Sequence, residues 1–247
     1  MTYQPRFYRG DFSTGRFQAF CFAVGESDLW VGVDKQAFCA SMVDFCKSLV
    51  AKLRKSVEVY IGNYPEFLNS LEPLITDKSM PGFAKKMIIA GSKAGVGPMA
   101  SIAGYFAGYM GWRLLENYKI KEVVIENGGD IFAKVNKPLL VSIYAGESFF
   151  SGKVGVVIPR GTYGICTSSG TVGHSYSKGN SDGVMIVCRD ITLADALATS
   201  HANSVENPGS IDSVIAMAKS KKEILSCIAI CRDKIGICGG LEVFYTE

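Results

Sequence analysis

The hydrophobic pattern at the start of the chain predicts a β-hairpin followed by a long helix. Segments 17–24 (FQAFCFAV) and 29–33 (LWVGV) are short apolar runs, and the turn residues GESD lie between them. From Lys35 onward, apolar residues recur every three or four positions, at Phe38, Met42, Phe45, Leu49 and Leu53. This spacing predicts a helix with one apolar stripe that packs against a core.

An apolar stretch over residues 87–112 contains Lys93 as its only charge. The sequence GVGP interrupts it, which predicts buried elements rather than a membrane span, because Gly-Pro ends one element and begins another. Pro98 suits the first turn of a helix that runs towards Asn117. Three glycines lie on or near one face of that helix, where another backbone or a flat ligand could come close, and helix-to-helix packing explains them equally well: Gly104, Gly108 and Gly111.

The remaining pattern mixes clustered strands with helices. Helices are expected around 65–75, from Thr192 and over 211–219, and strands at 122–126, 130–135, 139–145, 153–158, 162–166, 184–188, 223–231 and 235–245. We find no linker and no internal repeat, so a single domain over residues 1–247 is expected. The mixture predicts an α+β fold with mixed or antiparallel sheets and long packed helices.

Composition narrows the class of protein. The chain is 48% apolar and 20% charged, and a net charge of +3 is too small for a nucleic-acid-binding surface. The first residues, MTYQPRFYRGDF, do not resemble a signal peptide, so the cytoplasm is the expected location and most of the eight cysteines are expected to be buried thiols. Cys227, Cys231 and Cys238 could ligate zinc or an iron–sulfur cluster, although no CxxC supports this.

A tight turn is predicted in the segment IENGGDIF. Asn127, Gly128 and Gly129 would form the turn between two strands and present Asp130 at its edge. Two glycines without Cβ atoms would also let backbone N–H groups approach a phosphate or an aromatic ring. A purely structural hairpin turn explains the same residues.

The segment LADALATSHAN is predicted to be helical and to carry a metal site. Asp195 and Thr199 are four residues apart and share a face, which Asn203 extends. A carboxylate, a hydroxyl and waters form an oxygen-only set, which suits Mg²⁺ and not zinc. A solvated helix face has the same spacing.

The stretch 164–183 (GICTSSGTVGHSYSKGNSDG) is a candidate binding loop, although its Gly and Ser content also fits a flexible linker. Thr167, Ser168, Ser169 and Gly170 supply hydroxyls and backbone donors. His174 is a candidate general acid or base, because an ordinary histidine titrates near neutrality.

A dinucleotide-binding fold is an alternative. GVGPMA, residues 95–100, matches the pattern G-x-G-x-x-G/A, and Glu126 is a candidate ribose-binding acid. The preceding segment 82–94 fits a helix at least as well as the required strand, and Glu126 comes about ten residues late for this pattern.

The ordered motifs ENGGDIF, TSSG and ADALAT resemble the ApbE superfamily of flavin transferases. With RFYR, ESDLWVGVD, AGVGPMASIAG and GTVGHSYSKGNSDG, the chain is most similar to a small branch of that superfamily without an assigned activity. The resemblance implies an α+β T-fold and a site for FAD with Mg²⁺. It also implies cleavage of the FAD pyrophosphate, with FMN transferred to a Thr or Ser of a protein or released with AMP.

The resemblance also assigns roles to residues. Mg²⁺ would be held by Asp195, Thr199 and a backbone carbonyl near the start of the Gly-rich helix, and His174 would be the base. The flavin nucleotide would contact a set from the turn and the loop: Asn127, Gly128, Gly129, Asp130, Thr167, Ser168, Ser169 and Gly170. The implied partners are the flavin nucleotide and a protein acceptor of FMN, with a homodimer as an open alternative.

Two departures from the transferases keep other functions open. The segment GPMASIAGY lacks the Asp and the Lys or Glu that open the central helix of the transferases, and GHSYSKGNSDG lacks the Pro of their His-His-x-x-Asp-Pro segment. A protein that binds a nucleotide or another anion without chemistry, or a different reaction in the same cleft, is therefore also consistent with the sequence.

Overall fold

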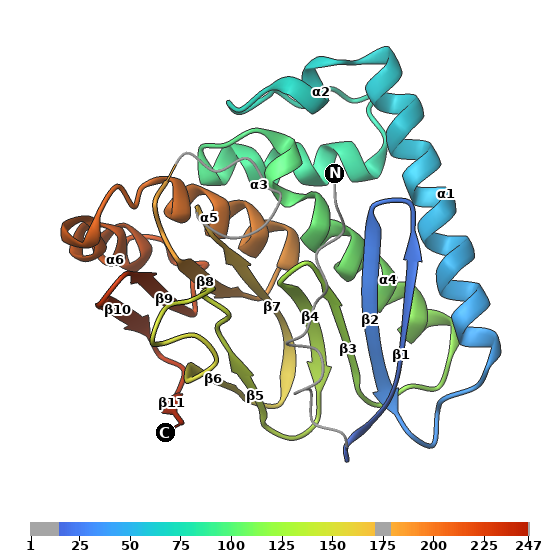
Figure 1. The fold of residues 1–247 in the computed structure, drawn as a ribbon. Helices are drawn as coiled ribbons and strands as arrows, with labels where there is room; N and C mark the ends of the chain where they lie inside the picture. The colour runs from blue at the N-terminus through green and yellow to red at the C-terminus, as the bar shows by residue number, and fades with distance from the viewer. Residues whose placement is uncertain (1–14, 171–178, 247) are drawn as a thin grey trace.

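An eight-stranded antiparallel sheet forms the centre of the computed structural model, which describes residues 15–170 and 179–246 (Figure 1). In spatial order its strands are β1 (Phe17–Val24), β2 (Ser27–Asp34), β3 (Val123–Asn127), β4 (Asp130–Val135), β7 (Gly161–Ser168), β8 (Gly183–Cys188), β9 (Ser226–Cys231) and β10 (Lys234–Gly239). A second antiparallel sheet has the order β11 (Val243–Tyr245), β6 (Val154–Ile158) and β5 (Leu139–Ser142). The predicted α+β class is confirmed.

Helices cover one face of the large sheet (Figure 1). They are α1 (Ser41–Asn63), the short α2 (Glu66–Asn69), α3 (Gly82–Ala94), α4 (Ile102–Asn117), α5 (Ile191–Asn203) and α6 (Ile211–Lys219), with 3₁₀ turns η2 (Pro98–Ser101) and η3 (Pro208–Ser210). The small sheet packs on the other face and closes a second core.

Burial of the large sheet on both faces explains its continuous apolar runs. In β8, Val184 and Ile186 face the helices, whereas Met185 and Val187 face the small sheet. Successive side chains of a strand point to opposite faces, so a strand between two layers needs apolar residues at every position. The run VMIVC is therefore a strand at the centre of three layers.

Most predicted elements are confirmed, with three corrections. The helix expected over 65–75 is limited to α2 (Glu66–Asn69), and the strand expected over 235–245 is divided between β10 of the large sheet and β11 of the small one. The hairpin of β1 and β2 is present with its turn at Gly25, which has a φ of 59°. The first helix was predicted from Lys35 but begins at Ser41, because the chain first turns, with the Ala37 amide donating to the Asp34 carbonyl (2.9 Å).

The apolar stretch 87–112 contains parts of two helices. α3 ends at Gly95 in the left-handed conformation (φ 77°), and Pro98 opens the 3₁₀ turn before α4. Among the described residues, none of the helices has the length and apolar character needed to cross a membrane.

The dinucleotide-binding alternative is wrong. GVGPMA follows helix α3 instead of a strand, and the sheets are antiparallel, whereas that fold needs a parallel βαβ unit. Glu126 is buried and accepts a hydrogen bond from the Gly129 amide (2.8 Å) within its own hairpin. It is therefore not presented to a ribose.

The glycines of α4 allow close packing of that helix. A Cβ atom on Gly104 would lie 2.8 Å from the Asp195 Cβ and 2.9 Å from the Ile191 carbonyl oxygen, and one on Gly108 would lie 2.6 Å from Ile191 Cγ2. Real Cβ atoms do not approach other atoms so closely. The small residues therefore set the distance between α4 and α5, as the packing interpretation predicted.

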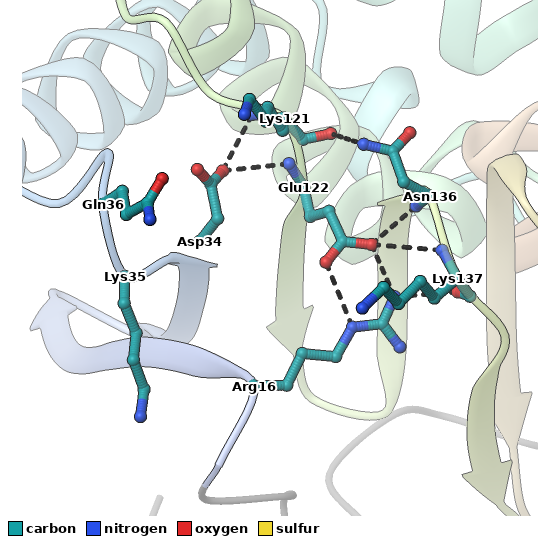
Figure 2. Close-up of a pocket in the computed structure, with 8 residues that line it drawn as sticks. All are labelled: Arg16, Asp34, Lys35, Gln36, Lys121, Glu122, Asn136 and Lys137. Carbon is teal, nitrogen blue, oxygen red and sulfur yellow. Dashed lines mark hydrogen bonds and ion pairs between the residues drawn. The ribbon is translucent and has the colours of Figure 1, made fainter.

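An ion pair fixes the start of the large sheet (Figure 2). Arg16 makes two hydrogen bonds to the Glu122 carboxylate, one of them from Nε to Oε2 at 3.1 Å. Beside it, Asp34 Oδ1 accepts the backbone amides of Lys121 (2.8 Å) and Glu122 (3.0 Å). These contacts join β1 and β2 to the beginning of β3. The hydrogen bonds from Arg16 lower the pKa of Glu122 against the opposing effect of burial.

Replacing Gly104 with Ala should destabilise the fold. Overpacking costs about 1–3 kcal/mol, and the better helix propensity of Ala returns about 0.5–1 kcal/mol, so we expect a net loss of about 1 kcal/mol or more in urea unfolding. Gly62→Ala is the matched control, since a Cβ there meets nothing within 4 Å. It should raise the stability slightly, and equal effects of the two variants would contradict the packing argument.

Replacing Glu122 with Gln should remove part of the acid sensitivity of the fold. The folded-state pKa of Glu122 is below its ordinary value, so the stability that this carboxylate contributes is present above about pH 4.5 and is lost as the pH falls through the lowered pKa. At pH 7 the variant should lose about 1 kcal/mol, and its stability should fall less steeply on acidification. Glu116→Gln, which breaks an exposed pair with Arg113, should cost less than about 0.5 kcal/mol.

Candidate functional site

Asn127 and Asp195, two of the predicted site residues, lie where the β3–β4 turn, the start of α4 and the helix α5 come together (Figure 1). Two hydrogen bonds join these elements. The Asn127 side-chain amide donates to the Ala103 carbonyl (3.0 Å), and the Gly104 amide donates to Asp195 Oδ2 (2.7 Å). Three segments that are far apart in the sequence are thereby held in one place.

The β3–β4 turn has the predicted form. Gly128 and Gly129 are its two central residues, both with positive φ (68° and 99°), which glycine adopts without strain. The Gly129 amide donates to Glu126, so this N–H group is bonded within the hairpin. Asp130, which was expected at the edge of the turn, is buried as the first residue of β4.

Asp195 is a buried carboxylic acid on α5. The helix begins where it does because Asp190 caps it, with Oδ1 accepting the amides of Thr192 (2.8 Å) and Leu193 (3.4 Å). Burial raises the pKa of Asp195 to about 7, against the opposing hydrogen bond from Gly104. Burial disfavours the charged form, whereas a cation next to this carboxyl group would favour it.

Thr199 lies one turn after Asp195 on the same face of α5. Its Oγ1 donates to the carbonyl oxygen of Ala100 (3.4 Å), which belongs to the 3₁₀ turn before α4. A carboxylate, a hydroxyl and a main-chain carbonyl therefore meet between α5 and the start of the Gly-rich helix.

Thr192 also lies on this face of α5, three residues before Asp195. Its side chain is buried, and its Oγ1 has no hydrogen-bond partner within the described part of the chain. Buried hydroxyl groups are normally hydrogen-bonded. This oxygen extends the polar stripe into the protein interior.

Cys166 joins the site, which the sequence analysis did not foresee. It is paired with Asp130 across β4 and β7, and its buried thiol lies near the Asp130 carboxylate and 3.6 Å from the Ile191 carbonyl. Burial raises the pKa of Cys166 strongly, and the charges of Asp130 and Asp195 add to this effect. Side chains alternate along a strand, so Gly164 and Cys166 of β7 share a face, and that face lies against α5. This alternation is the feature of the sequence that could have indicated the position of Cys166.

The predicted loop begins beside the turn. A Cβ on Gly129 would lie 3.4 Å from the Thr167 carbonyl oxygen, so the end of β7 and the β3–β4 turn are neighbours. After the strand, the Ser169 hydroxyl (3.1 Å) and the Gly170 amide (2.9 Å) both donate to the Ser181 carbonyl. His174 lies outside the residues that the structure describes.

Two cavities in the described part of the chain lie elsewhere. One of about 320 Å³ surrounds Arg16 and Asp34, and its lining residues are drawn in Figure 2. Glu122 and Asn136 in this lining precede and follow the Val123–Lys134 pair, so the cavity lies at the opposite end of the β3–β4 hairpin from the Asn127 turn. The other, of about 510 Å³, lies between α3 and the first residues of α5, with Lys86 and Lys93 on one side and Asp190 on the other. Neither is lined by Asp195 or Thr199.

The cysteine metal site receives no support. Cys231 ends β9 at the β9–β10 turn, whereas Cys227 lies four residues earlier, opposite Cys238. Over residues 15–170 and 179–246, we find no group of three or more His, Cys, Asp or Glu side chains that could hold a metal ion.

Comparison with known proteins identifies the family and the fold of this chain. The family model described as AbpE bacteria matches residues 10–229. A UPF0280 protein of Methanocaldococcus jannaschii is 34% identical over 223 residues (87% of this chain, 88% of the relative), and one of Methanococcus aeolicus is 38% identical over 185 residues (73% of each).

Solved structures show the same fold at low sequence identity. The flavinyl transferase ApbE of Pseudomonas stutzeri, in its apo form, has a TM-score of 0.63 at 13% identity and covers 90% of this chain and 94% of its own. The flavin transferase ApbE of Vibrio cholerae has a TM-score of 0.60 at 14% identity, with 90% and 96% covered. The fold is that of ApbE, and the chain belongs to the family described as AbpE bacteria, with the UPF0280 proteins as its relatives.

Proposed function

We propose that the protein binds FAD together with Mg²⁺ and cleaves the FAD pyrophosphate, passing FMN to a Thr or Ser of a protein or releasing FMN and AMP. The observation that carries this proposal is the set of three oxygens from Asp195, Thr199 and the Ala100 carbonyl. The two structural neighbours are flavin transferases. At their low sequence identity, they support the scaffold and not the reaction.

The residues on α5 suit Mg²⁺ as the metal. Carboxylate, hydroxyl and carbonyl oxygens are the ligands that this ion prefers, and it commonly keeps waters in addition. The buried Thr192 hydroxyl supplies another oxygen on the same face. When bound, Mg²⁺ would neutralise negative charge on the pyrophosphate.

The protein's own contribution is to hold these oxygens in place before a ligand arrives. The Gly104 amide fixes Asp195 Oδ2, and Asn127 fixes the β3–β4 turn on the carbonyl of Ala103. Catalytic groups that are fixed in advance need no reorganisation during the reaction. In this proposal Asp195 and Thr199 bind the metal and thereby orient the two phosphates.

The flavin nucleotide would lie against the turn and the loop that begins at Thr167. The amides of Gly129 and Gly170 already donate to protein oxygens, so we assign the contacts first to the hydroxyl of Ser168, which lies on the helix side of β7, and to the main chain of Thr167. Asn127, Gly128 and Ser169 would complete the surface next to the buried Asp130. His174 is proposed as the base that accepts the proton of the attacking hydroxyl.

Replacing Asp195 with Asn should abolish the reaction while keeping an acceptor for the Gly104 amide. Loss of a metal-binding carboxylate removes several kcal/mol of charge stabilisation, so AMP release from FAD in the presence of Mg²⁺ should fall about 100-fold or more. Asp44→Asn is the matched control, because Asp44 is an exposed residue of α1. AMP release is measured by chromatography, with thermal unfolding as the check on folding.

Thr199→Val should also weaken the reaction. It keeps the shape of the side chain but removes the oxygen next to the Ala100 carbonyl, and we expect about a 10-fold loss that excess Mg²⁺ partly restores. Wild-type turnover no higher than in buffer, with unchanged rates in both variants, would contradict the catalytic proposal.

Binding without chemistry is the second candidate. It is favoured by the segment from Gly97 to Tyr105, which lacks the acidic and the basic residue of the transferases. Titration calorimetry with FAD and with ADP, each with Mg²⁺, separates the two candidates. Tight binding without AMP after prolonged incubation would support a binding protein.

A further inference from the structure

We propose that Cys238 and Cys227 form a reversible disulfide, with Cys238 as the attacking thiol and a low-molecular-weight disulfide as the oxidant. The pair lies on β9 and β10 at the edge of the large sheet, and it is not part of the site on α5. The eight cysteines are free thiols in the structure.

The strand register places the two residues directly opposite each other. The β9–β10 hairpin closes with the pair Cys231 and Lys234 around a two-residue turn, in which Arg232 has a φ of 57°. In an antiparallel hairpin, the closing pair and every second pair after it exchange backbone hydrogen bonds. Counted from Cys231 and Lys234, Cys227 and Cys238 form such a hydrogen-bonded pair. Cα atoms in such a pair are about 5.5 Å apart, and disulfides join Cα atoms about 4.4–6.8 Å apart.

Both thiols lie on the face of the sheet below α6. Cys227 is fully buried in the core under the helices, and Cys238 Sγ lies 3.8 Å from the Ile215 carbonyl oxygen of α6. The two residues are paired across the strands, and each thiol shifts the pKa of the other. The sulfurs are therefore already neighbours before any bond forms.

The backbone around the pair is held firmly. The Ser226 hydroxyl donates to the Cys238 carbonyl (3.3 Å), and the Gly240 amide donates to the Leu225 carbonyl (3.0 Å). A slip of one residue would turn Cys238 to the other face of the sheet. These bonds fix the register, so the two sulfurs stay together.

The environments of the two thiols differ in the way that a two-step reaction needs. Cys238 is half-buried, whereas Cys227 is 0% exposed. The hydrogen bond with Cys227 lowers the pKa of Cys238 to about 7, and the charge of Lys219 lowers it further, whereas burial opposes both effects. For Cys227, the same hydrogen bond and burial both raise the pKa. Cys188, which also lies in the core under the helices, has its pKa raised to about 12 by burial. The thiolate is the attacking form, so Cys238 reacts first.

The reaction balances as a thiol–disulfide exchange. Cys238 gives its proton to water, and its sulfur attacks one sulfur of the small disulfide RSSR, forming a mixed disulfide while the S–S bond of RSSR breaks and releases RS⁻. Cys227 then loses its proton, and its sulfur attacks the Cys238 sulfur, releasing the second RS⁻. The two protons pass to the two RS⁻ anions. The protein pair is oxidised by two electrons, and RSSR is reduced to two molecules of RSH.

The test uses the full chain and glutathione disulfide as the probe. The folded protein is incubated anaerobically in glutathione buffers of increasing oxidation, quenched with acid, alkylated and analysed by peptide mass mapping. We expect one peptide pair that joins Cys227 to Cys238 with the loss of two hydrogens. In Cys227→Ala the product should stop at glutathione on Cys238, and Cys39→Ser, which removes an exposed cysteine, should behave as the wild type.

The rate of Cys238 alkylation against pH gives a second measurement that does not depend on disulfide formation. It should have its midpoint near pH 7 in the wild type and at a higher pH in Cys227→Ala, because the stabilising hydrogen bond is lost. Recovery of Cys227 and Cys238 as alkylated thiols under oxidising buffer would overturn the proposal. So would a mixed disulfide that persists on Cys238 in the wild type, since Cys227 would then not resolve it.

Discussion

The hydrogen bond from the Gly104 amide to the Asp195 carboxylate is the contact on which the arrangement of the site depends. It forms only because position 104 has no Cβ, which lets α4 approach α5 until a backbone amide reaches a side chain on the neighbouring helix. The same approach brings the Ala100 carbonyl to Thr199 and the Ala103 carbonyl to Asn127. One glycine thus connects the packing of two helices with the position of the Asp195 carboxylate.

Burial gives this contact its chemical character. Asp195 is buried on α5, and this burial raises the pKa of its carboxyl group to about 7, so the group lies near neutrality between its two protonation states. A cation or a ligand with its own charge would change that balance. The proton on Asp195 and any bound metal are therefore alternative means of neutralising the same buried group.

Much of the fold could be predicted from the sequence, because apolar residues recur every two positions in strands and every three or four positions in helices. The hairpin of β1 and β2, the break at Pro98 and the Gly-Gly turn all follow from local residue types. The start of α1 was misplaced by six residues, because the chain turns between Asp34 and Ala37 before the helix begins. Asp34 is held in place by the amides of Lys121 and Glu122, which are far along the chain. Local periodicity cannot reveal such a tertiary hydrogen bond.

The candidate site was only partly accessible to sequence reasoning. Asp195 and Thr199 share a helix face by spacing alone, so their proximity could be foreseen. Cys166 was missed because its place beside Asp130 comes from the pairing of β4 with β7, and these strands are separated in the chain by residues 136–160, which include β5 and β6. The pairing of Cys227 with Cys238 likewise depends on the register of a hairpin, whereas sequence proximity had suggested a metal site with Cys231.

The order of strands in the large sheet also has a consequence for how the chain folds. Four pairs of neighbouring strands, β1–β2, β3–β4, β7–β8 and β9–β10, are consecutive in the chain and can form as hairpins with modest loop-closure cost. The pairing of β2 with β3, in contrast, joins residues up to 98 positions apart, and the contact between Gly104 and Asp195 joins residues 91 positions apart. Non-local contacts form slowly because their entropy cost precedes their reward. We therefore expect the hairpins to form first, and the β2–β3 pairing and the polar junction of α4 and α5 to assemble late.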